Sequence, residues 1–396
     1  MKTLIIGGGA SGLVAAIYAS NNSEVTIIEK NSVLGKKILV TGNGKCNYWN
    51  SFQDISNYYS SNIDIVDKIL DDESKIEINK LFDKIGLVPK IKNGYYYPYS
   101  NQATTVQTAL IKEIKNRNIK VEYETEVIDI LYDNEFIVKT NRGEFRSDKV
   151  IVSTGSYACP KTGSDGYGYE VAKKFNHSII KPVPSLVQLK AKGNFFKDWA
   201  GVRSDVELTF NGITELGEIQ LTDYGVSGVC VYNLSSMISR DLLVSTPILK
   251  INFLPFLKSS EKFINYMNNR NKMVINRTIS ELLDGLLNYK LVNLILKLSN
   301  IDRDLKWNDI SNSKKIVLAD NITNFNLEII DTTGFDRAQT CSGGIPLNEI
   351  NPGTMESLKQ KGLYFTGEIL DADGKCGGYN LEFAFITGYK AGRSND

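Results

Sequence analysis

Residues 2–12 of the chain read KTLIIGGGASG, and this stretch decides the fold. The apolar run that ends at Ile6 is followed directly by a glycine-rich turn, and residues 13–19 then have the composition of a helix. A second apolar run, residues 24–28, ends in the acid Glu29. A G-x-G-x-x-G motif between a strand and a helix, with an acid about 20 residues further on, is typical of a dinucleotide-binding βαβ unit.

Each glycine of this motif has a physical role. Gly7 permits the tight turn, Gly9 lets the backbone approach a pyrophosphate, and Gly12 lets the helix pack closely against the strand. The first N–H groups of the helix have no intrahelical partner, so they would face the phosphates. Glu29 would accept hydrogen bonds from a ribose diol. An ordinary glycine-rich turn is the alternative, and the strand, helix and acid together weigh against it.

Composition limits the remaining possibilities. The 396 residues are 42% hydrophobic and 23% charged, as in a soluble globular protein of two or three domains. A net charge of +1 gives no broad basic face, so we expect no nucleic-acid partner. His177 is the only histidine, which argues against Ser-His-Asp catalysis and poly-His metal sites; we expect it to be structural, and we expect no metal.

The sequence also indicates where the protein works. It shows no signal-peptide pattern and no run of about 20 apolar residues, so we expect no membrane association. The five cysteines are scattered and contain no C-x-x-C, which indicates a reducing cytoplasm and neither a disulfide scaffold nor a zinc site. The oligomeric state is left open.

Glycine-rich, cofactor-type motifs occur at both ends of the chain, and the middle of the chain has a different residue pattern. From about residue 182 apolar residues alternate with polar ones, which is typical of an antiparallel sheet, and residues 263–299 have helical spacing. After residue 329 come a strand ending in Gly367-Glu368 and then Gly377-Gly378 before a last helix. We therefore expect an α/β fold in which a discontinuous domain, residues 1–184 and 328–396, is interrupted by a β-rich part, residues 185–262, and a helical part, residues 263–327.

Several further motifs make a family recognisable. They are Gly35-Lys36-Lys37, Thr41-Gly42-Asn43-Gly44-Lys45-Cys46-Asn47, Tyr97-Pro98-Tyr99-Ser100, Ser153-Thr154-Gly155, Pro160-Lys161-Thr162-Gly163-Ser164, Thr366-Gly367-Glu368 and Gly377-Gly378-Tyr379-Asn380. With the first glycine motif, they make the chain resemble, over nearly its whole length, the aminoacetone-oxidase-type or bile-acid-reductase-like FAD-dependent oxidoreductases. This family belongs to the two-dinucleotide-binding-domain flavoproteins.

The resemblance implies FAD held between the two chain ends in a Rossmann-like domain, covered by an inserted β-rich domain with a small helical subdomain. By the same resemblance, the motif glycines take the pyrophosphate, Glu29 takes the ribose, and residues 41–47 lie along the flavin. The residues expected to contact FAD are Gly7, Gly9, Ala10, Ser11, Gly12, Glu29, Lys30, Lys36, Lys37, Thr41, Gly42, Gly44, Cys46, Asn47, Val127, Thr154, Gly155, Gly367, Glu368, Asp373, Gly378, Tyr379 and Asn380.

The chain departs from the family pattern at three positions. Lys45 stands where members usually carry Arg, so a bidentate contact becomes a point charge. Cys159 replaces a tyrosine that commonly precedes Pro-Lys-Thr-Gly, and Asp223 replaces a histidine in the turn before Gly-Val-Ser-Gly.

Three chemistries remain open at this point. The first is reduction of the FAD by transient NAD(P)H, followed by hydride transfer to an activated C=C bond of a small molecule. The second is oxidation of a small amine with oxygen as acceptor, and the third is action on RNA. The catalytic group is unknown; the candidates are Tyr97, Tyr379 and Cys46.

Overall fold

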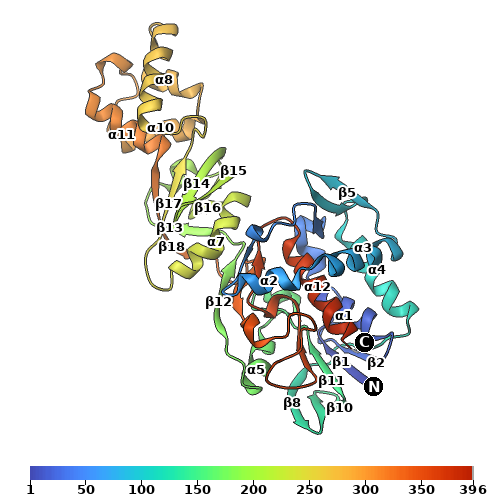
Figure 1. The fold of residues 1–396 in the computed structure, drawn as a ribbon. Coiled ribbons are helices and arrows are strands. Elements are labelled where there is room, and N and C mark those ends of the chain that lie inside the picture. The colour runs from blue at the N-terminus through green and yellow to red at the C-terminus, as the bar shows by residue number, and fades with distance from the viewer. Residues whose placement is uncertain (395–396) are drawn as a thin grey trace. The chain divides into compact units, whose positions relative to one another are not determined.

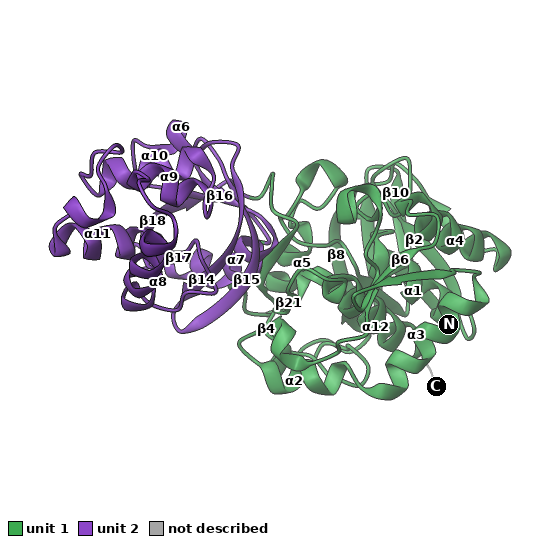
Figure 2. Cartoon of the chain, turned by 90° about the horizontal axis from the view of Figure 1, so that it is seen from above, with its two compact units in different colours: residues 1–185, 335–396 green, residues 186–334 purple. Residues whose placement is uncertain are grey.

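The computed structural model describes residues 1–394. The chain divides into two compact units, shown in green and purple in Figure 2. Unit 1 comprises Met1–Ser185 and Phe335–Asp396, and unit 2 comprises Leu186–Gly334. Unit 1 is thus built from both ends of the chain.

A five-stranded parallel sheet forms the centre of unit 1. Its order is β20 (Leu363–Phe365), β11 (Lys149–Val152), β1 (Lys2–Ile6), β2 (Glu24–Ile28) and β7 (Lys120–Glu122). β1 and β11 carry runs of buried aliphatic residues, as expected for parallel strands that are covered on both faces. The strand β20, from the C-terminal part of the sequence, therefore completes a sheet begun at the N-terminus.

The helix α1 (Ala10–Ala19) packs on this sheet, and α4 (Ala103–Asn116) and α12 (Tyr379–Arg393) pack against α1. In Figure 1 the red helix α12 lies beside the blue α1. A Cβ added at Gly388 would lie 2.3 Å from the carbonyl oxygen of Ser11, so only glycine allows this approach. The close packing brings the last helix to the start of the first one.

Smaller elements complete unit 1. A meander consists of β8 (Val127–Asp133), β9 (Glu135–Thr140) and β10 (Gly143–Ser147), and a second small sheet of β3 (Trp49–Asn50), β6 (Tyr95–Pro98) and β5 (Pro89–Lys92). Two pairs are β12 (Ile180–Ser185) with β19 (Thr340–Gly344) and β4 (Tyr58–Tyr59) with β21 (Asp373–Gly374). The helices are α2 (Ile63–Ile69), α3 (Asp72–Lys84) and α5 (Tyr167–Lys174), with short 3₁₀ segments that include η1 (Ile38–Gly44) and η2 (Ile55–Asn57).

Unit 2 contains a closed six-stranded barrel. Its order is β13 (Leu189–Ala191), β16 (Gly225–Ser227), β15 (Ile213–Leu221), β14 (Arg203–Phe210), β17 (Ile248–Asn252) and β18 (Phe325–Thr332). The helices are α6 (Phe196–Trp199), α7 (Val229–Asp241), α8 (Ser260–Met273), α9 (Ile279–Asp284), α10 (Tyr289–Leu298) and α11 (Asn312–Thr323). The barrel strands and helices contribute to one hydrophobic core, so the β-rich and helical parts form a single unit.

Strand pairing sets the limits of three segments. Residues 121–132 contain two strands, because β7 joins the parallel sheet while β8 begins the meander. The segment 221–228 contains the barrel strand β16, which pairs with β15. The return to unit 1, expected at residue 328, lies at Phe335, because β18 pairs with β13 and β17 of the barrel.

Candidate active site

The glycine motif forms the turn between β1 and α1. Gly7 has a φ of +96°, a conformation that L side chains rarely adopt. A Cβ at Gly12 would lie 2.0 Å from the carbonyl oxygen of Gly7, so the helix can follow the strand this closely only with glycine there. At Gly9, the N-cap of α1, an added Cβ would meet one atom, Ser153 O at 3.9 Å. The backbone at the helix start is thus open to a ligand.

Glu29 follows β2 and lies beside this turn. The carboxylate is nearly buried and accepts hydrogen bonds from three N–H groups: Gly8 N at 2.8 Å, Asn31 N at 2.8 Å and Asn31 Nδ2 at 2.7 Å. These contacts hold the carboxylate in one orientation at the edge of the pocket described next. A fixed acceptor at this place suits a sugar diol.

One pocket of unit 1 collects most of the sequence-predicted residues. Those that line it are Gly7, Gly9, Ala10, Ser11, Glu29, Lys30, Lys36, Lys37, Thr41, Val127, Thr154, Gly155, Glu368 and Asn380. Residues from both ends of the chain therefore face the same space. Its lining also includes residues that the sequence analysis did not give as FAD contacts, among them Asn31, Ile38, Thr125, Thr162, Ser164, Asp165, Tyr167, Gln339 and Phe383.

The other predicted residues are not part of this lining. Gly12 and Gly367 pack against residues that line the pocket. A Cβ at Gly12 would contact the carbonyl oxygen of Gly7, and a Cβ at Gly367 would lie 2.7 Å from Ser11 Oγ. The remaining residues lie in two places. Gly42, Gly44, Cys46 and Asn47 are in or directly after η1, and Asp373, Gly378 and Tyr379 are in β21 and at the start of α12.

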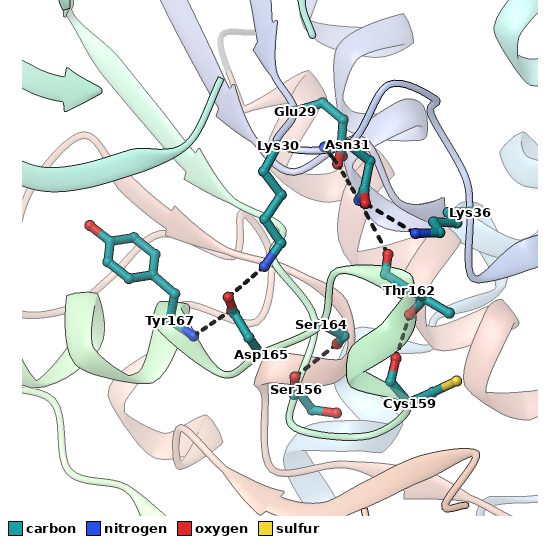
Figure 3. A network of polar contacts seen from close by, with 10 residues as sticks. All are labelled: Glu29, Lys30, Asn31, Lys36, Ser156, Cys159, Thr162, Ser164, Asp165 and Tyr167. Carbon is teal, nitrogen blue, oxygen red and sulfur yellow. Dashed lines mark hydrogen bonds and ion pairs between the residues drawn. The ribbon is translucent and has the colours of Figure 1, made fainter. Parts of the chain in front are cut away.

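A polar network at one end of the pocket includes Asn31 and Asp165, which the sequence analysis did not name (Figure 3). Asn31 Nδ2 donates to the carbonyl oxygen of Thr162 at 3.2 Å, and Lys30 Nζ lies 2.5 Å from Asp165 Oδ2. These contacts join the residues after β2 to the glycine-rich segment 160–166 at the pocket edge. The position of Asn31 two residues after the acid could have suggested it; nothing local marks Asp165 as the partner of Lys30.

A second ion pair joins the two ends of the chain inside the pocket. Lys37 Nζ lies 2.5 Å from Glu368 Oε2 and donates to the carbonyl oxygen of Ala158 at 3.1 Å. Ser156 Oγ donates to the same carboxylate at 3.1 Å. Lys36, in contrast, contacts Asn31 Oδ1 at 3.3 Å. The two adjacent lysines thus serve different parts of the pocket wall.

The loop of residues 41–47 lies against the aromatic strand β6. A Cβ at Gly42 would lie 3.9 Å from Tyr97 Cε1, and Tyr48 N donates to the carbonyl oxygen of Tyr96 at 2.9 Å. Cys46 is fully buried, and its burial raises the pKa of the thiol to about 11. The thiol is therefore protonated near neutral pH and is a poor nucleophile.

The two candidate tyrosines also hold their protons. Burial raises the pKa of Tyr97, and burial raises the pKa of Tyr379 to about 12. Each hydroxyl can therefore act as a proton donor at neutral pH and is a poor base. The ring of Tyr379 lies near Gly377, where an added Cβ would be 2.9 Å from Cε2.

His177 lies apart from the pocket lining, in unit 1. Its ring is buried, with Nδ1 2.9 Å from Glu349 Oε2 and Nε2 2.6 Å from Ser357 Oγ. Burial lowers the pKa of the imidazole. Both nitrogens are occupied by protein groups, which gives this histidine a structural role, as the sequence suggested.

The pocket has the donors and acceptors that an adenine dinucleotide requires. The N-terminus of α1 has no side-chain cap, the fixed carboxylate of Glu29 can bind a ribose, and lysines face the same space. Thr154 Oγ1 lines the pocket and is buried with no partner within the described residues. The residues present fit FAD.

Comparison with known proteins identifies the family. The HI0933-like protein Rossmann domain matches residues 1–394. The chain belongs to the HI0933-like family. It is 37% identical over 408 residues to the 3-dehydro-bile acid delta(4,6)-reductase of Clostridium scindens, with 98% of each chain covered.

Two further likenesses complete the comparison. The chain is 26% identical to the ribosomal RNA dihydrouridine synthase of Escherichia coli, which covers 98% of this chain and 96% of that protein. The solved 3-ketosteroid-delta4-(5alpha)-dehydrogenase of Rhodococcus jostii RHA1 matches 99% of this chain and 96% of its own, with a TM-score of 0.50 and 14% identity, and shows the fold. This member of the HI0933-like family is an FAD-dependent oxidoreductase. No helix within residues 1–394 has the length and apolar character needed to cross a membrane.

Proposed function

We propose that this protein is an FAD-dependent reductase that adds two hydrogens to an activated C=C bond of a small molecule. The observation that carries the proposal is the full-length 37% identity to a bile-acid delta(4,6)-reductase. The pocket supports it, because residues from both chain ends supply the groups that an adenine dinucleotide needs. The proposed substrate is a molecule whose double bond is conjugated to a carbonyl.

The roles of the pocket residues follow from their positions. The open N–H groups at Gly9 to Ser11 would bind the pyrophosphate, and Glu29 would bind the adenosine ribose. Lys37 and Glu368, paired at 2.5 Å, would line the middle of the cofactor. Asn380 lines the pocket, and its side-chain amide accepts a hydrogen bond from Gly374 N at 2.9 Å and donates one to Gly374 O at 2.8 Å. These bonds would hold the start of α12 against the cofactor.

FAD, when bound, supplies the two-electron chemistry. The protein then has to orient the acceptor, exclude water and supply a proton. We propose that the acceptor binds beside the loop of residues 41–47 and the strand β6, which lie together in unit 1. Tyr97 and Tyr379 are the proposed proton donors, since each hydroxyl keeps its proton at neutral pH.

We propose NAD(P)H as the source of the electrons. The sequence has one G-x-G-x-x-G motif after a strand, so the nicotinamide has no dinucleotide motif of its own. NAD(P)H and the acceptor would then use the same face of the site in turn. This order gives ping-pong kinetics. The proposed location is the cytoplasm, where scattered cysteine thiols stay reduced.

RNA is a second candidate substrate because two ribosomal RNA dihydrouridine synthases match 98% of the chain. Dihydrouridine differs from uridine by two hydrogens across one C=C bond, so both kinds of relative carry out the same type of reduction. Two observations favour the small molecule: the higher identity to the bile-acid reductase and the net charge of +1.

The test is anaerobic stopped-flow reduction of the holoenzyme with NADH and with NADPH. The reduced protein is then mixed with a steroidal conjugated enone, with ribosomal RNA or with a small amine-derived imine. Rapid reoxidation by the enone is expected. Reoxidation by RNA alone would move the substrate to RNA, and sluggish reduction by both nicotinamides with rapid reduction by an amine would favour an amine oxidase.

A further inference from the structure

A buried carboxylic acid lies in the first turn of α12, immediately after two pocket-lining residues, Asn380 and Leu381. It is Glu382, whose exposed fraction is 1%. Its Oε1 accepts a hydrogen bond from Gln53 Nε2 at 2.8 Å, and its Oε2 lies 3.3 Å from Tyr58 Oη. The chemistry described above gives this acid no role, and burying an ionised carboxylate without a paired charge costs free energy.

The hydroxyl of Tyr58 contacts two oxygens with a single proton. It lies 3.1 Å from the carbonyl oxygen of Tyr379 and 3.3 Å from Glu382 Oε2. A backbone carbonyl can only accept. With Glu382 protonated, the acid donates to the phenol and the phenol donates to the carbonyl, so both contacts are made. With Glu382 ionised, both neighbours are acceptors, and Tyr58 donates its one hydrogen bond to the carboxylate, which is the stronger acceptor.

Glu382 is the group in this cluster that changes charge near neutral pH. Burial raises its pKa to about 7, while Lys75 of α3 and the hydrogen bond from Tyr58 oppose that rise. Burial also raises the pKa of Tyr58 well above its usual value and that of Tyr379 to about 12, so both phenols stay protonated. Asp54, which also acts on Tyr379, has its pKa lowered by hydrogen bonds within its own turn and stays ionised.

We infer that Glu382 is a positioning residue whose protonation, relayed by Tyr58, sets how firmly the N-terminal end of α12 holds FAD. In the neutral state, Tyr58 anchors the first turn and the positive end of the helix is free to attract the cofactor's negative groups. In the ionised state, the anchor is lost and a buried negative charge opposes that attraction. This inference rests on FAD occupying the pocket.

The sign of the pH dependence follows from these two states. FAD favours the neutral acid, so retention is strongest below the pKa of Glu382 and weakens as pH rises through it. The experiment measures the rate of FAD release from the diluted holoenzyme by flavin fluorescence between about pH 6 and about pH 8.5. Release should accelerate roughly three- to tenfold across that range, the effect expected of one charge at a helix end.

Two variants separate this role from a structural one. In Glu382→Gln the amide can accept from Gln53 and donate to Tyr58, as the neutral acid does, so release should be slow and independent of pH. In Tyr58→Phe the relay is cut, so release at low pH should be faster than in the wild type and the pH step smaller. Glu349→Gln, a change of another acid that is hydrogen-bonded to His177, should keep the wild-type step.

Infrared difference spectra between the two pH limits give a readout independent of release. A protonated carboxylic acid band should disappear on raising the pH in the wild type and be absent in Glu382→Gln. An unchanged pH step in Glu382→Gln, or fast release from that variant at every pH, would overturn the inference. A wild-type protein that binds no FAD would instead overturn the cofactor assignment itself.

Discussion

Gly12 lies at a position of the motif where the backbone leaves no space for a side chain. Replacement by valine would place a Cβ 2.0 Å from the carbonyl oxygen of Gly7, so α1 must move away from the strand. We expect Gly12→Val to abolish FAD retention, because the N–H groups at the helix start are then misplaced. The measurement is the flavin-to-protein ratio after purification. Gly353→Val, where the added Cβ meets only Asn351 Oδ1 at 3.4 Å, is the control; stoichiometric flavin in a folded Gly12→Val protein would refute the assignment.

Glu29 contributes contacts at one end of the cofactor, so its loss should be milder. Glu29→Ala removes the proposed ribose contacts and the acceptor for Gly8 N and Asn31 N. Hydrogen bonds to a charged group contribute about 1.5–3 kcal/mol, so we expect the dissociation constant for FAD to rise about tenfold or more. Titration of the apoprotein with FAD checks this. A loss of FAD binding as large as that in Gly12→Val would contradict the prediction that Glu29→Ala is the milder change.

Cys46 is expected to take no part in redox cycling. It is buried, its thiol pKa is raised to about 11 by burial, and the structure forms no disulfide within residues 1–394. Cys46→Ser should keep most of the nicotinamide-dependent reduction of the flavin, with some loss of stability from burying a hydroxyl. Stopped-flow reduction and thermal unfolding measure the two effects, with Cys159→Ser as the control. Lost turnover with full flavin content would make the thiol catalytic.

At the scale of elements, the segment 160–166 is tied to the end of β2. The Lys30–Asp165 pair, at 2.5 Å, is partly exposed, with side chains 29% and 45% accessible. Exposed ion pairs contribute at most about 1 kcal/mol, so its share in closing the pocket edge is modest. The hydrogen bond from the Asn31 side-chain amide to the carbonyl oxygen of Thr162 supports the same junction.

Asp165→Asn should therefore speed FAD release by only about two- to fivefold. Raised salt should speed release from the wild type and leave the variant almost unchanged, since salt screens an exposed pair. Release rates at two salt concentrations check both effects. Glu135→Gln, which breaks the exposed Arg146–Glu135 pair of the meander, is the control. Equal rates in all three proteins would show that the junction does not hold the cofactor.

For the molecule as a whole, the prediction concerns the order of its substrates. With one dinucleotide motif, NAD(P)H and the acceptor should share a face, so double-reciprocal plots at several acceptor concentrations should be parallel. The reduced holoenzyme should also react with an enone after all nicotinamide has been removed. Intersecting lines, together with no reaction of the nicotinamide-free reduced protein, would require a complex that holds both substrates at once.

The sequence by itself determined what depends on neighbouring residues. The turn at Gly7, the helix that follows it and the acid at Glu29 are local features, because glycine and strand-to-helix periodicity act within a few residues. The helix over residues 103–116 also matches its apolar spacing. The family resemblance named 14 residues that line the pocket, most of them in glycine-rich motifs that mark where the backbone approaches a ligand.

The tertiary structure alone decided which distant segments meet. Lys30 and Asp165 are 135 positions apart, and Tyr58 and Glu382 are 324 positions apart, so no local pattern pairs them. Glu382 has the sequence context of an ordinary acid in a helix, and only the tertiary packing buries it and raises its pKa to about 7. The end of unit 2 at Gly334 was likewise set by strand pairing, because β18 has the same apolar alternation whichever sheet it joins. Partners and burial come from the folded chain, and these set the chemistry of a charged group.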